Sequence, residues 1–241
     1  MPTFFLLLHQ HYKLLITFFR TLCIPTAILL SPQIKADFNA KVEISTDRIF
    51  RGISQIENGL APSGTLAYQS ESGAYLGVSL AKNELRVPGN SLEQLYFLGY
   101  HRKINNSIGL DISYLSYQFD DAPNVPNLNW EELHLRLQIT PSTALLLISS
   151  DSWLRRQESQ QIEISHLRGL TEKTRLQMSV GAVIPSGQSL DNYHYAEIGL
   201  IYGISANTYL RADLSVTDDV ARDLFGSNAD NKLRISLGYL F

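Results

Sequence analysis

The side chains of this chain that could do chemistry are mainly charged ones that recur at every second position of apolar segments. In residues 130–139, for example, Glu132, His134 and Arg136 alternate with leucines. Because neighbouring side chains of a strand point to opposite faces, these charges share one face. The same pattern elsewhere predicts one charged inner surface, formed by Lys41, Glu43, Asp47, Asp111, Glu132, Arg136, Glu163, Arg175, Glu197, Arg211, Asp213 and Arg234. A surface with both signs of charge suits contact with water, ions and polar solutes.

Bond-making chemistry has little support in the sequence. Ser165 and His166 are adjacent, and on a strand they would point to opposite faces, so they cannot form a nucleophile and base pair. His134 faces inward, but no spacing identifies a Ser or Asp partner for it. No cysteine, histidine and aspartate spacing resembles a metal site. We therefore predict a protein that is not an enzyme and needs no cofactor.

An acidic segment, residues 218–230, is the one place where a surface Ca²⁺ could bind through side-chain oxygens. Its oxygen ligands would come from Asp218, Asp219, Asp223, Asn228 and Asp230. A solvated acidic loop is the simpler interpretation, because acidic side chains are usually exposed to water.

The last eleven residues show the two-residue period most clearly. One face is apolar and the other polar, and the apolar face consists of Leu233, Ile235, Leu237, Tyr239 and Phe241. An apolar face that runs to a terminal aromatic resembles the closing strand of an outer-membrane β-barrel. In such barrels this strand resembles the signal that the assembly machinery binds, and here Tyr239 and Phe241 are expected to provide it. The alternative is an ordinary edge strand of a soluble sheet.

The N-terminal segment has the features of a secretory signal. An apolar stretch covers 14–30, Lys13 precedes it, and residues 31–36 end in Lys35-Ala36. We predict a cleaved signal peptide over residues 1–36 and a mature chain over 37–241. A membrane anchor is the alternative, but Arg20 and Pro25 would make a poor spanning helix.

Composition excludes other classes of protein. The mean hydropathy of −0.05 is too low for a bundle of membrane helices. Loss of residues 1–36 would leave 17 basic and 23 acidic residues, a net charge of −6, which argues against a nucleic-acid partner. The only cysteine, Cys23, lies in the predicted signal, so the mature chain would contain no disulfide.

Twelve segments with a strand-like pattern follow the predicted signal: 38–50, 65–69, 74–81, 92–102, 108–119, 130–139, 143–150, 162–167, 175–184, 193–204, 209–217 and 231–241. Their connections alternate strictly between long and short. Outer-membrane barrels have an even number of strands, short periplasmic turns and longer outer loops. We therefore predict an all-β protein, a transmembrane antiparallel β-barrel of about twelve strands. A soluble lipocalin-like barrel or sandwich is the alternative.

Three segments also resemble a known family. Residues 47–55 read D-R-I-F-R-G-I-S-Q and are similar to the first signature of the TorF-type porins, a proteobacterial group of unknown function. Residues 71–78 and 92–100 are similar to its second and third signatures. The matching positions of the first are Asp47, Phe50, Arg51, Gly52, Ser54 and Gln55. The chain departs from the family at Arg48, where an aromatic is usual, and at Leu95, where an acid is usual. The resemblance implies a membrane barrel more firmly than a pore.

Aromatic residues near the strand ends are expected to form the girdles at the two membrane surfaces, with ordinary packing as the alternative. The candidates are Tyr68, Tyr100, Tyr114, Tyr117, Trp130, Trp153, Tyr202, Tyr239 and Phe241. Arg48 and Arg51 border the first outer loop. They could attract an anionic solute or bind lipopolysaccharide phosphates, or the motif could simply form a structural turn at Gly52.

These observations predict a porin-like channel in the outer membrane of a Gram-negative bacterium, through which small polar solutes or ions diffuse. The expected partners are outer-membrane lipid, lipopolysaccharide, the barrel assembly machinery and small solutes. The alternative function is a closed barrel with a structural or surface-binding role, in which salt-bridged side chains fill the lumen. An outer-membrane hydrolase is a distant third possibility.

Overall fold

The computed structural model describes residues 36–56, 59–84, 91–119, 129–154, 157–187 and 190–241. The predicted signal peptide lies almost wholly outside these residues, so that assignment and its cleavage site stay predictions. No helix in the described part of the chain is long and apolar enough to cross a membrane.

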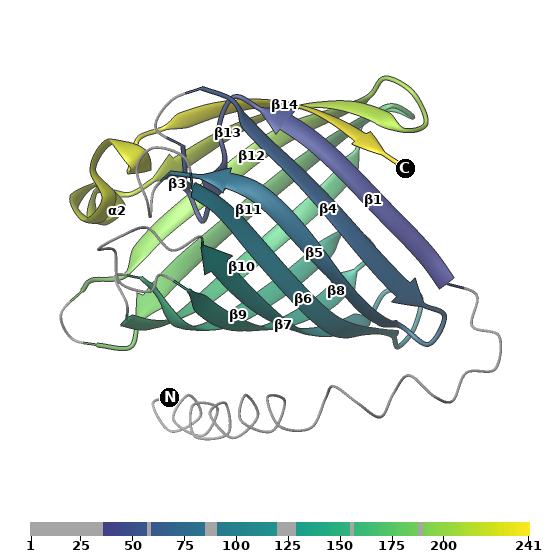
Figure 1. Ribbon diagram of the computed structural model, residues 1–241, viewed down its shortest axis with the longest axis horizontal. Coiled ribbons are helices and arrows are strands. Elements are labelled where there is room, and N and C mark those ends of the chain that lie inside the picture. The colour runs from purple at the N-terminus through teal and green to yellow at the C-terminus, as the bar shows by residue number, and fades with distance from the viewer. Residues whose placement is uncertain (1–35, 57–58, 85–90, 120–128, 155–156, 188–189) are drawn as a thin grey trace. The chain divides into compact units, whose positions relative to one another are not determined.

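Within the described residues, twelve antiparallel strands form one closed barrel (Figure 1), which confirms the predicted fold. Each strand pairs with its sequence neighbour in the barrel. The strands are β1 Ala36–Ser45, β4 Ala61–Ser70, β5 Ala74–Asn83, β6 Ser91–Lys103, β7 Gly109–Phe119, β8 Trp130–Thr140, β9 Thr143–Leu154, β10 Gln157–Gly169, β11 Thr174–Pro185, β12 Tyr193–Gly203, β13 Thr208–Thr217 and β14 Lys232–Leu240. We call the end of the barrel that carries the five tight turns the short-turn end, and the opposite end the long-loop end.

The first and last strands close the barrel. β1 and β14 are antiparallel, with Lys41 opposite Leu240 and Ser45 opposite Ser236. The amide of Phe241 also donates to the carbonyl of Ala40 at 2.9 Å. The C-terminal segment is therefore paired on both sides and is not an edge strand. Closure removes the unpaired backbone groups that a sheet edge would expose to lipid.

The two faces of the barrel wall have the polarity of a membrane protein. Large apolar side chains are exposed on the outside, including Leu76 and Val180, each 57% exposed. At alternating positions, Ser179 and Asp213 are buried on the inner face. A soluble protein would place these side chains the other way round. The outer face therefore suits hydrocarbon and the inner face suits polar contacts.

Two short elements and one helical segment lie outside the barrel ring. β2 Ile49–Phe50 pairs with β3 Ile53–Ser54, and the last long connection contains α2 Asp219–Phe225 and a 3₁₀ turn Gly226–Ala229. The prediction of one strand over 38–50 was therefore wrong. The hydroxyl of Ser45 donates to the carbonyls of Asp47 and Ala61, which ends β1 and turns the chain into the β2–β3 hairpin.

The predicted polar loop over 151–160 was also largely wrong. β9 continues to Leu154 and β10 begins at Gln157. This extension lies at the long-loop end, beyond the exposed apolar side chains. The part of a strand that extends beyond the membrane needs no apolar outer face. A polar segment such as 151–160 can therefore still be a strand.

A cation on the outer face should destabilise the barrel, whereas the same cation on the inner face should not. Val180→Arg places a guanidinium near the middle of β11 on the lipid side, and Gln177→Arg is the matched inner-face control. We expect Val180→Arg to lower the free energy of unfolding in lipid vesicles by about 2–4 kcal/mol. Urea titration of the folded fraction measures this. Equal stability of the two variants would contradict the assignment of the faces.

Candidate functional site

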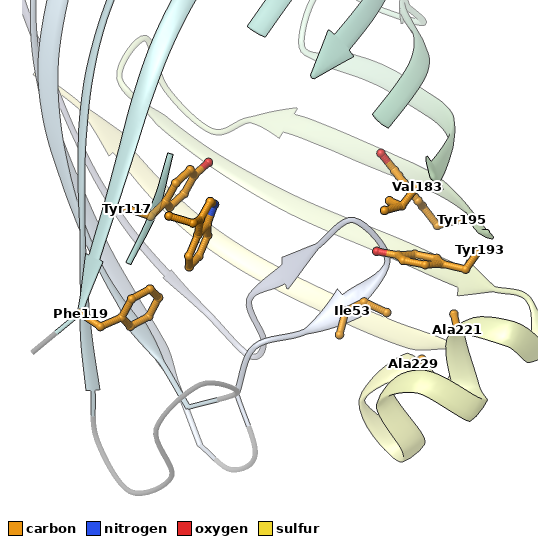
Figure 2. Packing of buried hydrophobic residues seen from close by; sticks show 9 residues of the cluster. Ile53, Tyr117, Phe119, Val183, Tyr193, Tyr195, Ala221 and Ala229 are labelled. Carbon is orange, nitrogen blue, oxygen red and sulfur yellow. The ribbon is translucent and has the colours of Figure 1, made fainter. Parts of the chain in front are cut away.

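The β2–β3 hairpin carries the first family-like motif and turns at Arg51 and Gly52. Both residues have positive φ, 56° and 80°, as a two-residue hairpin turn of type I′ requires. A Cβ on Gly52 would lie 2.6 Å from Thr217 Cγ2 and 2.7 Å from Tyr195 Cβ. The tip of the hairpin is therefore packed against β12 and β13 (Figure 2), and only glycine fits this position.

A buried ion pair holds the hairpin tip to the opposite side of the barrel. Arg51 Nη2 lies 2.6 Å from Glu132 Oε1, and the two side chains are 4% and 0% exposed. Trp130 Nε1 donates to the same Glu132 oxygen at 3.1 Å, and His134 Nε2 lies 2.8 Å from its other oxygen. Tyr193 of β12 donates to the Arg51 carbonyl at 3.3 Å. A segment that leaves β1 and contacts both β8 and β12 must pass through the interior of the barrel.

The pKa of Arg51 follows from these neighbours. Burial alone would lower the pKa of the guanidinium, but the Glu132 carboxylate raises it above its usual value. Arg51 is therefore a permanent cation whose charge is balanced inside the lumen.

A second ion pair fixes the base of the hairpin. Arg48 forms a two-point contact with the buried Glu93 of β6, with one N–O distance of 2.8 Å. Asn83 donates to Glu93 at 2.8 Å and to Gln55 at 3.2 Å. Burial would lower the pKa of Arg48, but Glu93 raises it. Arg48 thus joins the first family-like motif to the third.

Arg48 and Arg51 therefore do not act as the surface groups that the sequence allowed. Both side chains are engaged by carboxylates inside the barrel, and Arg51 is buried. These contacts favour the third interpretation, a structural turn at Gly52, over binding of lipopolysaccharide phosphates or attraction of an anionic solute. Within the motif, Asp47 accepts a hydrogen bond from Ser54 at 2.8 Å, so it also contributes to the hairpin.

Aromatic side chains complete the packing around the hairpin. Phe50 contacts Tyr117 edge-to-face at 6.0 Å, and Tyr117 stacks on Trp130 at 4.3 Å. Figure 2 shows Ile53 of β3 near Tyr193 and beside Ala221 and Ala229 of the last long connection. Together these side chains fill the lumen at the long-loop end.

Tyr117 and Trp130 were predicted to belong to a membrane-surface girdle, and this was wrong. Both are buried on the inner face. Trp130 is two residues before Glu132 and therefore lies on the same face of β8, which the two-residue period already implied. The side chain of Trp153 lies outside the described residues.

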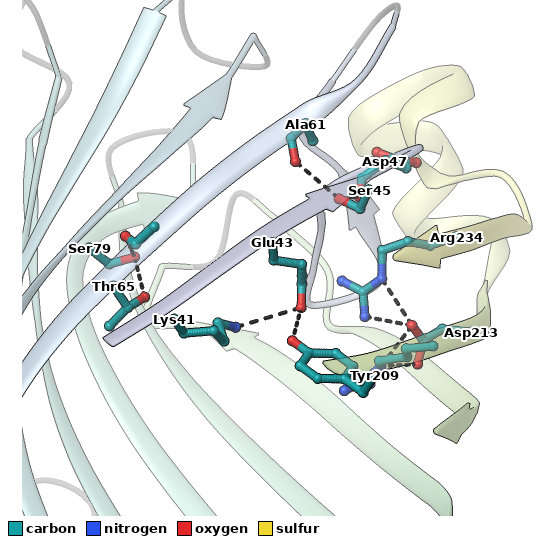
Figure 3. Close-up of polar contacts among 12 residues, drawn as sticks. Lys41, Glu43, Ser45, Asp47, Ala61, Thr65, Ser79, Tyr209, Asp213 and Arg234 are labelled. Carbon is teal, nitrogen blue, oxygen red and sulfur yellow. Dashed lines mark hydrogen bonds and ion pairs between the residues drawn. The ribbon is translucent and has the colours of Figure 1, made fainter. Parts of the chain in front are cut away.

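The structure brings most of the predicted inner charges into defined contacts (Figure 3). Asp213 accepts from Arg211 Nε at 2.6 Å and from Arg234 Nη2 at 2.9 Å. Glu43 accepts from the Tyr209 hydroxyl, and Lys41 Nζ lies 3.7 Å from Glu43. These contacts join β1, β13 and β14 around the closure of the barrel.

The remaining predicted inner residues lie on other strands. Glu163 accepts from Tyr195 at 2.6 Å, and Asp111 is directly opposite Arg136 in the register of β7 and β8. Glu197 lies opposite Ser179 and Ser215. Arg175 lines a cavity at the short-turn end.

That cavity has a volume of about 600 Å³. Side chains that share the inner face line one side of it, and these include Arg175, Gln177 and Tyr209. The lining also includes residues 172–173 and 203–207 at the tight turns, together with Leu167, Ile201, Thr208 and Leu240. The two ends of the barrel thus differ: one is packed by the hairpin and the other contains this cavity.

Three tyrosines that sequence reasoning missed form a repeated arrangement on the inner wall. Each tyrosine lies over a glycine of the adjacent strand, and its hydroxyl donates to a carboxylate one strand further on. The three sets are Tyr75, Gly99 and Asp111; Tyr195, Gly181 and Glu163; and Tyr209, Gly238 and Glu43. The sequence signal that could have predicted this arrangement is a tyrosine on the polar face of one strand and a glycine on the polar face of the next. The arrangement keeps the rings along the wall.

The other candidate groups have structural contacts. Asp218 caps α2 by accepting from the Ala221 amide at 2.9 Å, and it also contacts His194. Burial would raise the pKa of Asp218, but these hydrogen bonds lower it below its usual value. Among the described residues, no group of three or more His, Cys, Asp or Glu could hold a metal ion. His166 Nδ1 lies 2.9 Å from the Thr143 hydroxyl.

Comparison with known proteins shows the family. The model of Gcw_chp, a bacterial protein family of unknown function, matches residues 31–155, which is more than half of the chain. The chain therefore belongs to this family. No curated protein matches it. Neither result names the TorF-type group.

Solved structures show the same type of barrel. The KdgM porin has a TM-score of 0.55 at 11% identity, over 84% of this chain and 99% of that one. The KdgM porin in complex with disordered oligogalacturonate has a TM-score of 0.51 at 10% identity, over 86% and 98%. The COG4313 outer membrane channel from Pseudomonas putida F1 has a TM-score of 0.52 at 12% identity, over 90% and 98%. At these identities the likeness establishes the fold.

Two glycines allow a matched test of the hairpin tip. Gly52 and Gly59 both have positive φ, but only Gly52 has atoms within 4 Å of its hypothetical Cβ. Alanine at either position is strained by its backbone conformation, whereas Gly52→Ala also collides with β12 and β13. We expect faster hydrogen exchange at Ile53 and Ser54 in Gly52→Ala than in Gly59→Ala. Equal exchange rates would show that the tip is not held by this packing.

Removing the buried cation should release the hairpin without unfolding the barrel. Arg51→Ala leaves the Glu132 carboxylate buried without its cation, a change that typically costs about 3–5 kcal/mol. We expect trypsin to cleave after Arg48 at least about tenfold faster, while the folded barrel keeps its electrophoretic mobility. Lys41→Ala, which removes a half-exposed ion pair, is the control and should change neither property. Unchanged cleavage in Arg51→Ala would rule out the ion pair as the restraint.

Proposed function

We propose that this Gcw_chp member is an outer-membrane channel for the diffusion of small polar solutes or ions, closed at one end by its β2–β3 hairpin. The observation that carries the proposal is the polar inner wall, with both signs of charge, inside a barrel whose outer face is apolar. The similar barrels described above are a porin and an outer membrane channel. Hollow space of about 600 Å³ at the short-turn end supports solute entry or exit there.

The orientation follows from the usual arrangement of such barrels. Short turns face the periplasm and long loops face outward. The hairpin would then close the outer mouth, and the cavity would open to the periplasm. We propose that the predicted signal peptide directs export, and that the chain resides in the outer membrane of a Gram-negative bacterium. We also propose that, within the Gcw_chp family, this chain is related to the TorF-type porins that its three motifs resemble.

The proposed partners are outer-membrane lipid, lipopolysaccharide and the assembly machinery. Phe241 is 70% exposed and packs edge-to-face on Tyr239, with ring centroids 4.7 Å apart. Both rings are thus presented at the outside of the closing strand, where a receptor for this segment could contact them.

A closed barrel with a structural role is the second candidate function. Its supporting observation is the burial at the long-loop end, where Glu132, Ile53 and Tyr193 are all 0% exposed. One buried ion pair holds the hairpin tip. A channel requires the hairpin to leave this position, whereas a closed barrel with a structural role requires it to stay. Catalysis has no supporting geometry in the described residues.

Single-channel recording of the refolded chain 37–241 in a planar bilayer tests the channel. We expect rare, discrete current steps from the parent protein and a higher open probability from Arg51→Ala, because that change releases the hairpin. A folded protein that gives no steps in either form would support the closed barrel instead.

Selectivity should depend on inner-wall charge. Arg136 lies on the inner face of β8, and Arg102 lies on the outer face of β6 with an exposed side chain. We expect Arg136→Ala to shift the reversal potential in a KCl gradient toward cation preference, because one fixed positive charge leaves the lumen. Arg102→Ala is the control and should leave it unchanged. Equal shifts would mean that the current does not pass along this wall.

A further inference from the structure

Two aromatic rings lie side by side on the inner wall near the short-turn end. Tyr75 is the second residue of β5, Phe97 lies in β6, and their ring centroids are 6.3 Å apart with planes tilted by 54°. Both side chains are half-buried, while their neighbours Leu76 and Leu98 are exposed on the outer face. We call the pair Tyr75 and Phe97 the aromatic platform.

Glycines keep the platform along the wall. Tyr75 pairs with Gly99 in the register of β5 and β6, and Phe97 pairs with Gly77. A Cβ at either glycine would collide with the ring that lies over it. Each ring therefore lies against the backbone of the neighbouring strand, on the inner face of the barrel wall.

Polar groups surround the platform, and their charges cancel. Tyr75 donates to Asp111 Oδ1 at 2.9 Å. Asp111 lies directly opposite Arg136 on β8, and His101 Nδ1 is 3.9 Å from Asp111 Oδ2. One carboxylate and one guanidinium thus lie beside the ring and leave little net charge there.

We infer that the aromatic platform binds an uncharged sugar ring, an inference that rests on the proposed channel function and names its solute class. A pyranose has an apolar face, which packs on an aromatic ring, and hydroxyls at its edge, which bond to carboxylates and guanidinium groups. An ion gains little binding free energy at a site whose fixed charges cancel. A purely apolar solute would leave the polar groups of the site without hydrogen-bond partners.

Another tyrosine that lies over a glycine and donates to a carboxylate is found on another part of the wall. Tyr209 lies over Gly238, donates to Glu43, and lines the cavity at the short-turn end. Lys41 lies 3.7 Å from Glu43, so the carboxylate beside this ring also has a cation close to it. Tyr209 is thus a second ring on the inner wall at the short-turn end on which a sugar could pack.

The alternative is that these rings have only a structural role, because aromatic rings that cover glycines stabilise the neighbouring strands. A purely structural role predicts lower stability on substitution and no effect of sugars. A solute-binding role predicts sugar affinity that depends on the ring itself, so the experiment measures affinity in variants that remain folded.

Titration calorimetry of the refolded chain 37–241 in detergent, with maltohexaose, cellohexaose and xylohexaose as probes, tests the inference. We expect at least one of these neutral sugars to bind, and Tyr75→Ala to weaken its binding about tenfold. Tyr75→Phe keeps the ring and should retain most of the affinity. Tyr96→Ala removes an exposed tyrosine from the outer face of the same strand pair and should bind like the parent protein.

Several results would overturn the inference. These are the absence of binding to all three sugars, equal affinity of Tyr75→Ala and Tyr96→Ala, or tighter binding of trigalacturonate than of any neutral probe. If Tyr75→Ala does not fold, Phe97→Leu replaces it and the same comparison applies. Binding does not require conduction, so a silent bilayer with sugar binding contradicts the channel alone, and conduction without sugar binding contradicts the platform alone.

Discussion

The contact between Arg51 and Glu132 is the interaction on which the arrangement of the lumen depends. Neither charge could remain in its buried position alone, because an unpaired ion loses its hydration there. With the pair formed, the hairpin tip can lie across the interior and Tyr117, Trp130 and Tyr193 can pack around it. Electrostatics therefore decides where the hairpin lies, and apolar packing fills the space that this position creates.

The wall of the barrel is subject to a different constraint. Long side chains directed into the lumen would fill a barrel of twelve strands. The wall avoids this where Tyr75, Tyr195 and Tyr209 lie over glycines, and their hydroxyls reach carboxylates two strands away. A glycine on the inner face thus determines the direction of a ring on the next strand, and the ring in turn orients a carboxylate.

The strands of the barrel wall could be predicted from the sequence, whereas the β2–β3 hairpin could not. The cost of a charge in lipid and the two-residue period together identify both faces of each strand, so the number of strands and their polarity followed. The hairpin was missed because Asp47 and Phe50 continue the alternation of residues 38–44, and periodicity does not show where a strand leaves the sheet. Ser45, whose hydroxyl reaches the carbonyls of Asp47 and Ala61, makes that turn. Long-range contacts such as Arg51 with Glu132 have no local signal.

The position of the motif limits what it can do. Residues 47–55 lie inside the barrel, where Arg48 and Arg51 already have carboxylate partners and Gly52 is enclosed. A segment with its polar groups engaged in this way closes the lumen and has little left with which to distinguish solutes. In the proposed channel, discrimination between solutes would then come from the wall on the other side of the hairpin. There a cavity is lined by Tyr209, and half-buried rings such as Tyr75 and Tyr209 lie beside carboxylates. Closure and selection are thus carried by different residues, so one can be altered experimentally without the other.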